Sequence, residues 1–126
     1  MVNPKDFREK IWEILSQEYK IEFLGTDFEE TVKKISETKA EQIYHWVKQV
    51  VEGNVAPIMK NIRDKKYKGI PLNKLLSFRK EIQISGNEHR ILLIKIKNEN
   101  YIEFHLSQHK YYDTLRKDLS LTTKDG

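Results

Sequence analysis

Apolar positions follow two periods along this chain, a helical one in the first half and a strand-like one in the second. Near the N-terminus, Asn3 before Pro4 is typical of the start of a helix. Apolar residues then recur at intervals of one, three and four positions, at Phe7, Ile11, Ile14 and Leu15. We therefore expect a helix from about residue 4 to residue 16, within an accessory N-terminal segment of residues 1–18.

A strand and two helices are expected next, within residues 19–53. Residues 19–24 alternate in polarity before Gly25, which favours a short strand over a frayed continuation of the first helix. Thr26 or Asp27 can cap a second helix, and a third runs from about Thr38 to the stop at Gly53. Their apolar stripes are Phe28, Val32 and Ile35, and then Ala40, Ile43, Tyr44, Val47, Val50 and Val51. The very short turn between these helices predicts an antiparallel helical hairpin.

Alternation with a period of two marks the segment that follows. We expect a three-stranded antiparallel meander at residues 78–85, 89–97 and 101–106, with polar turns between the strands. The outer strands have one apolar and one polar face, whereas the middle strand is apolar on both sides. One sheet face should pack on the helical hairpin, and the other should present polar and ionisable groups. A short helix over residues 111–119 ends the pattern.

These elements indicate one α+β domain over residues 1–126. A chain of 126 residues is long enough for one core and too short for two. A connector of residues 54–76 joins the segment 19–53 to the sheet and terminal helix of residues 77–119. The chain has no cysteine and no apolar run that could span a membrane, and its N-terminus is too charged for a signal peptide. We therefore expect a cytoplasmic protein with no membrane partner.

Charge is distributed unevenly between the two halves. Residues 1–58 carry 8 Lys and Arg against 11 Asp and Glu, whereas residues 59–126 carry 15 against 8. A basic surface attracts polyanions, of which nucleic acid is the commonest, although anionic lipid or an acidic protein segment would also fit. The candidate nucleic-acid-binding residues are Lys60, Arg63, Lys65, Lys66, Lys68 and Arg79. The alternative for this run of charges is a solvated surface.

The second half also resembles a known group of toxins. Glu88-His89-Arg90 precedes an apolar strand, a polar turn, a second apolar strand and the His/Lys/Tyr cluster of residues 109–112. This arrangement, within residues 71–112, is similar to the RelE/YoeB/HigB/ParE superfamily of toxin-antitoxin systems. Members of that superfamily also place a strand and a helical hairpin before the sheet, as expected for residues 19–53.

The resemblance implies a toxin that cleaves messenger RNA on the ribosome, uses no metal or cofactor, and is neutralised by a cognate antitoxin. Carried over by position, the family's arginine corresponds to Arg90, its basic or histidine group to His109 or Lys110, and its tyrosine to Tyr111 or Tyr112. Arg90 would stabilise charge on the phosphorane, and His109 would act as acid or base. The tyrosine would stack on a base or orient the nucleophile.

The first strand of the meander departs from the family pattern. Glu81 and Gln83 stand where RelE-type members carry two lysines, although YoeB-type members use a carboxylate as base, a role that Glu81 could take. ParE-type members share the fold and act on DNA gyrase without cutting RNA. A noncatalytic module that binds nucleic acid or protein is therefore the alternative, and a phage or mobile-element interaction protein with an open sheet edge is a third.

Each candidate residue also has a purely structural explanation. Arg90 could pair with Glu81 or Glu103 across the sheet. If Arg90 is locked to Glu103 and His109 faces bulk water, binding is favoured over catalysis. His45 and His105 have no histidine or carboxylate at the usual ligand spacing, so we expect no metal site. The chain also lacks the motifs of nucleotide hydrolysis and dinucleotide binding.

Overall fold

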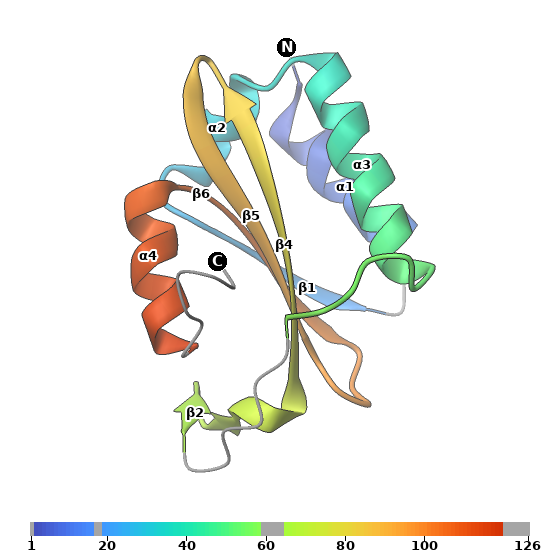
Figure 1. The fold of residues 1–126 in the computed structure, drawn as a ribbon. Coiled ribbons are helices and arrows are strands. Elements are labelled where there is room, and N and C mark those ends of the chain that lie inside the picture. Colours follow the sequence, from blue (N-terminus) through green and yellow to red (C-terminus); the bar gives the residue numbers. More distant parts are fainter. Residues whose placement is uncertain (1, 17–18, 59–64, 120–126) are drawn as a thin grey trace.

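The computed structural model describes residues 2–16, 19–58 and 65–119, and over these ranges the chain is an α+β structure with four α-helices (Figure 1). This confirms the expected fold class. The helices are α1 (Pro4–Ile14), α2 (Phe28–Lys33), α3 (Glu37–Val51) and α4 (His109–Asp118). The strands are β1 (Lys20–Leu24), β2 (Lys66–Tyr67), β3 (Ile70–Pro71), β4 (Leu75–Ile84), β5 (Asn87–Ile96) and β6 (Tyr101–Gln108). No helix in the described ranges is long and apolar enough to cross a membrane.

The main sheet has the strand order β1-β6-β5-β4, and β2 and β3 form a separate hairpin. Strands β4, β5 and β6 are the expected antiparallel meander, while β1 pairs parallel with β6, starting with Lys20 beside Tyr101. The strand that the sequence favours over residues 19–24 is thus present. After β1, Gly25 has a φ of +139°, and a Cβ atom there would lie 2.0 Å from the carbonyl oxygen of Leu106. This position therefore requires glycine.

One face of the sheet packs against α1, α2 and α3 (Figure 1). Phe104 of β6 lies fully buried in this layer, and its ring centroid is 5.9 Å from that of Phe7 and 5.6 Å from that of Phe23. Helix α3 packs mainly beside α1, and not beside α2 as the expected hairpin implied. The physical reason is length, because α2 has only 6 residues, whereas the 11 residues of α1 present a longer apolar stripe.

The opposite face is covered in part by α4 and the β2–β3 hairpin (Figure 1). A second group of buried apolar side chains lies there, namely Leu72, Leu75, Leu92, Ile94, Ile96, Tyr112, Leu115 and Leu119. The middle strand is therefore buried on both sides, as its sequence predicts. The polar face expected from the sequence is instead a mixture, with an apolar centre beneath α4 and ionisable groups on both sides of it.

The connector contains more regular structure than its sequence indicates. Residues 66–71 form the β2–β3 hairpin, with Lys68 at a φ of +49° in its turn. Ile58 makes an isolated bridge to Ser77, and β4 begins at Leu75, inside the segment that we expected to be connector. Strands of two residues are too short to show a period, so the sequence pattern does not reveal them. Helix α4 likewise begins at His109, two residues earlier than expected.

The side chain of Asn3 caps the start of α1. The Oδ1 atom of Asn3 accepts hydrogen bonds from the backbone N–H groups of Lys5 and Asp6, at 2.9 and 3.2 Å. We expect Asn3→Ala to lower the free energy of unfolding by about 1 kcal/mol in urea denaturation, because these N–H groups lose their acceptor. Asn3→Ser keeps an acceptor and should retain most of that stability. Equal losses in both variants would contradict the capping explanation.

Candidate functional site

The candidate residues gather on the sheet face that α4 covers, in two clusters on opposite sides of this helix. Tyr111 and Tyr112 are consecutive in α4, so their side chains leave the helix about 100° apart. Tyr112 reaches Arg90 of β5, and Tyr111 reaches His105 of β6. The arginine cluster is Arg79, Glu81, Arg90 and Tyr112. The glutamate–histidine cluster is Tyr67, Lys68, Tyr101, Glu103, His105 and Tyr111.

The arginine cluster is built by the register of β4 and β5, which places Glu81 opposite Arg90. Arg90 is 7% exposed, and its Cζ atom lies 5.7 Å from the centroid of the Tyr112 ring. Its guanidinium pairs with Glu88, and its Nη2 atom lies 3.6 Å from Oε1 of Glu81. Arg79 pairs with the same oxygen at 3.1 Å. Arg90 therefore has the cross-strand partner Glu81 that its structural explanation requires, and not Glu103.

Two polar atoms of this cluster are buried without a hydrogen-bond partner in the described part of the chain, Nε of Arg90 and the hydroxyl of Tyr112. Burial raises the pKa of Tyr112, while the charges of Arg79, Arg90 and Arg116 oppose that rise. The phenol therefore keeps its proton near neutral pH. An unpaired buried donor costs stability, so the cluster holds hydrogen-bonding capacity that the fold does not use.

The glutamate–histidine cluster is centred on Glu103, whose side chain is 3% exposed. Its Oε1 atom accepts hydrogen bonds from the hydroxyl of Tyr67 and from Nε2 of His105, each at 2.7 Å. Its Oε2 atom accepts from Nζ of Lys68 at 2.8 Å and lies 3.4 Å from the hydroxyl of Tyr101, which donates to Glu22. Strand β6 places Glu103 and His105 on one face, and the β2–β3 hairpin brings Tyr67 and Lys68 over them.

These contacts fix the charge of the buried carboxylate. Burial alone would raise the pKa of Glu103, but the hydrogen bonds from His105, Lys68 and Tyr67 outweigh it and lower the pKa to about 2. The other imidazole nitrogen, Nδ1 of His105, lies 3.1 Å from the hydroxyl of Tyr111. Burial and the charge of Glu103 raise the pKa of Tyr111, against the opposing effect of Lys68. Glu103 is therefore ionised and Tyr111 protonated near neutral pH.

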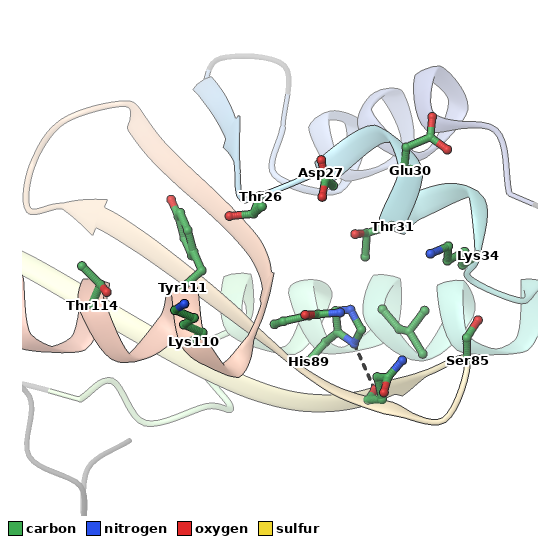
Figure 2. A pocket seen from close by; sticks show the side chains of 13 residues that line it. Thr26, Asp27, Glu30, Thr31, Lys34, Ser85, His89, Lys110, Tyr111 and Thr114 are labelled. Carbon is green, nitrogen blue, oxygen red and sulfur yellow. Dashed lines mark hydrogen bonds between the residues drawn. The ribbon is translucent and has the colours of Figure 1, made fainter.

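A cavity of about 690 Å³ lies between α2, the β4–β5 turn and the start of α4 (Figure 2). Its wall carries both signs of charge, with Asp27, Glu30, Lys34 and Lys110 among the lining residues. His89, which is 4% exposed, also lines it, and its Nδ1 atom lies 3.0 Å from the carbonyl oxygen of Asn87. A carbonyl only accepts, so Nδ1 carries a proton, and a neutral imidazole then has its lone pair on Nε2.

The structure thus separates residues that the sequence grouped together. Among the predicted catalytic residues, Arg90, Glu81 and Tyr112 meet in the arginine cluster, whereas Tyr111 belongs to the other cluster and Lys110 is exposed at the cavity of Figure 2. The predicted nucleic-acid-binding residues are also divided: Arg79 lies in the arginine cluster, and Lys65, Lys66 and Lys68 are exposed at the hairpin. Lys60, Arg63 and the side chain of His109 lie outside the described residues.

The sequence did not single out Glu103 and His105 as a pair. The available signal was their spacing of two residues on an apolar strand, which puts a carboxylate and an imidazole side by side on one sheet face. In the described ranges, no group of three or more His, Asp or Glu residues is arranged to hold a metal ion. The arginine and lysine side chains of the two clusters can bind phosphate, and their tyrosine, histidine and glutamate side chains can transfer protons.

Comparison with known proteins finds no relative that would assign a role to either cluster. No family model, no curated protein and no solved structure matches the chain.

Proposed function

We propose that this chain is a RelE-like toxin that stops growth by cleaving messenger RNA on the ribosome and is neutralised by an antitoxin that covers its basic face. One observation carries the proposal: cations and proton-transfer groups from β4, β5, β6, the hairpin and α4 gather on a single face of the sheet. The chain also has a strand, two helices and a three-stranded meander in this order, and this is the order of elements that the sequence resemblance implies.

The chemistry of RNA cleavage matches the side chains on this face. Without a metal, the reaction needs a base for the 2′-hydroxyl, a cation for the phosphorane and an acid for the departing 5′-oxygen. Arg79 and Arg90 supply cations, and Glu81, whose side chain is 55% exposed, holds both guanidinium groups. Glu81 and His105 are among the proton acceptors on the described part of this face.

The test is growth and RNA integrity after induced expression. Wild type should arrest growth and create new 5′ ends in total RNA. Arg90→Lys keeps a positive charge but loses the planar two-pronged contact with phosphate, so we expect about 100-fold fewer new ends at equal soluble expression. Arg8→Lys is the matched control, because Arg8 pairs with Glu29 in the helical layer, away from both clusters. Harmless expression of wild type would contradict the toxin assignment.

The noncatalytic alternative is supported by a different observation. Arg90 is buried and already paired with two carboxylates, Glu81 and Glu88, which is how a structural arginine is held in a sheet. A module that binds nucleic acid or a protein target such as gyrase would use the exposed lysines Lys65, Lys66 and Lys68. The ion pairs of Arg90 would then stay intact. Growth arrest without new RNA ends would favour this function over cleavage.

A further inference from the structure

Two largely buried polar side chains line the cavity of Figure 2 without a partner in the described part of the chain. The imidazole of His89 is 4% exposed, and its Nδ1 atom is bonded to the carbonyl oxygen of Asn87, which leaves its Nε2 atom unpaired. Thr31 of α2, which is 9% exposed, lies above this ring in Figure 2, and its hydroxyl is also unpaired. An unsatisfied buried polar group costs stability, so the cavity has to supply both groups with water or a ligand.

Charged side chains of both signs surround these two groups. Asp27, Lys34 and Lys110 all line the cavity, and none of them forms an ion pair within the described ranges. Glu30 lines it as well, but its carboxylate already accepts a hydrogen bond from Nζ of Lys33 at 3.1 Å. Among the described lining residues, the charges left for a ligand are therefore one negative charge, on Asp27, and two positive charges, on the lysines.

The two lysines stand on opposite sides of the imidazole, and Asp27 lies on the α2 side between them (Figure 2). Lys110 is in the first turn of α4, whose N-cap residue, Gln108, makes no side-chain hydrogen bond to the helix. The backbone N–H groups and the dipole at the start of a helix favour an anion. The end of the cavity at Lys110 is therefore suited to a carboxylate, and Lys34 offers a second cation at the other end.

An acidic amino acid carries the complementary set of charges, one ammonium and two carboxylates. An ammonium has three N–H donors, and the carboxylate of Asp27, Nε2 of neutral His89 and the hydroxyl of Thr31 can all accept. Each carboxylate can accept from one lysine. A dicarboxylate without an ammonium would leave Asp27 and the imidazole lone pair unused, and a diamine would face two cations. The volume of about 690 Å³ is within the range of ligand sites.

We infer that this cavity binds a free acidic amino acid. The ammonium of the ligand donates to Asp27, His89 and Thr31. One of its carboxylates lies at Lys110 and the start of α4, and the other lies at Lys34. The recognition is therefore of charge at three points, and the loss of any one of the three charges, from the ligand or from the protein, should weaken binding.

This site is distinct from the two clusters on which the proposed function rests. Side chains alternate along β5, so His89 is on the sheet face of the helical layer, whereas Arg90 is on the face of α4. The inference therefore goes beyond the proposed function, and binding of the amino acid does not depend on RNA cleavage.

The experiment titrates the purified chain with L-glutamate and follows binding by calorimetry. Binding should saturate at one molecule per chain. Asp27→Asn should raise the Kd by about 10-fold to 100-fold, the effect of losing one hydrogen bond to a charged group. Asparagine suits this position because Asp27 has a φ of +55°, a left-handed conformation that asparagine tolerates. Lys48→Gln is the matched control, because Lys48 is exposed on α3 and does not line the cavity, and it should bind like wild type.

Ligands that lack one charge test the recognition without any change to the protein. Glutarate lacks the ammonium and L-glutamine lacks the side-chain carboxylate, so each should bind about 10-fold to 100-fold more weakly than L-glutamate. Lys34→Gln and Lys110→Gln should each weaken the binding of L-glutamate, and one of them should bind L-glutamate and L-glutamine equally. In NMR spectra, L-glutamate should shift the imidazole signals of His89 and leave those of His45, which is exposed on α3, in place.

Each outcome bears on the inference in a defined way. Saturable binding with these preferences and a shift at His89 supports it. Equal affinity for glutarate and L-glutamate, or unchanged affinity in folded Asp27→Asn, overturns the recognition of the ammonium and with it the inference. Absence of saturable binding to wild type also overturns it, while the proposed function, which is tested by growth and RNA ends, stands or falls separately. Urea denaturation identifies any variant that fails to fold, and the comparison of ligands on wild type does not depend on the variants.

Discussion

Glu103→Gln is expected to lower the free energy of unfolding by about 3 kcal/mol at pH 7, measured by urea denaturation. The pKa of Glu103 is about 2 in the folded protein against an ordinary 4.5, and each unit of difference is equivalent to about 1.4 kcal/mol. The amide would also present N–H groups where the carboxylate accepts bonds from Tyr67, His105 and Lys68. Glu9→Gln is the matched control, because Glu9 is exposed on α1 and should lose less than about 1 kcal/mol.

The difference in unfolding free energy between wild type and Glu103→Gln should also depend on pH, in a direction that the lowered pKa of Glu103 determines. Because the folded-state pKa of Glu103 is lowered, the folded state binds fewer protons than the unfolded state between about pH 5 and pH 2. The stabilisation is complete above that window and is lost as the pH falls through it. The stability difference between wild type and Glu103→Gln should therefore shrink towards zero near pH 2. A difference that stays constant down to that pH would show that the variant acts through packing and not through charge.

Phe104→Ala is expected to lower the free energy of unfolding by about 3–5 kcal/mol, the usual cost of deleting a fully buried aromatic ring. Phe104 lies between the rings of Phe7 in α1 and Phe23 in β1, so its removal opens a cavity between the sheet and the helices. A domain of this size has about 5–15 kcal/mol of stability in total, so the variant should show a much lower denaturation midpoint in urea.

Two controls make the Phe104 prediction specific. Phe104→Leu keeps most of the volume and should lose clearly less stability than Phe104→Ala. Val51→Ala shortens a side chain at the end of α3 that is 51% exposed, and it should change stability by less than about 0.5 kcal/mol. Similar losses in Phe104→Ala and Val51→Ala would contradict the position of Phe104 at the centre of the helical layer.

The parts of the fold that the sequence predicts correctly are those with a long local pattern. The cap and apolar spacing of α1, the alternation in β4, β5 and β6, and the two-sided apolar run of β5 are each readable within one segment. The pairing of β1 with β6 is not readable in this way, because alternation shows that a segment is a strand but not which strand it joins. The strands β2 and β3 are too short for any period.

In the candidate site too, the sequence predicts the contacts that depend on a local pattern and misses those that depend on packing between distant segments. The sequence offers Glu81 as a partner for Arg90, and the structure has this pair because a tight turn fixes the register between β4 and β5. Tyr111 and Tyr112 are alternatives in the sequence, and only the packing of α4 directs them to different clusters. The burial of Glu103 depends on a hairpin more than 30 residues away in the chain, so alternation alone places this carboxylate on an open polar face.

The parallel pairing of β1 with β6 has a consequence for the synthesis of the chain. Lys20 pairs beside Tyr101, so β1 leaves the ribosome about 80 residues before its only partner strand in the described ranges. At about 5–20 residues per second, β1 waits roughly 4–16 s for that partner. Glu103 and His105 arrive on the same late strand. A ribosome that stops before residue 101 therefore releases a chain with an unpaired first strand and without His105, one of the proton acceptors that we propose for RNA cleavage.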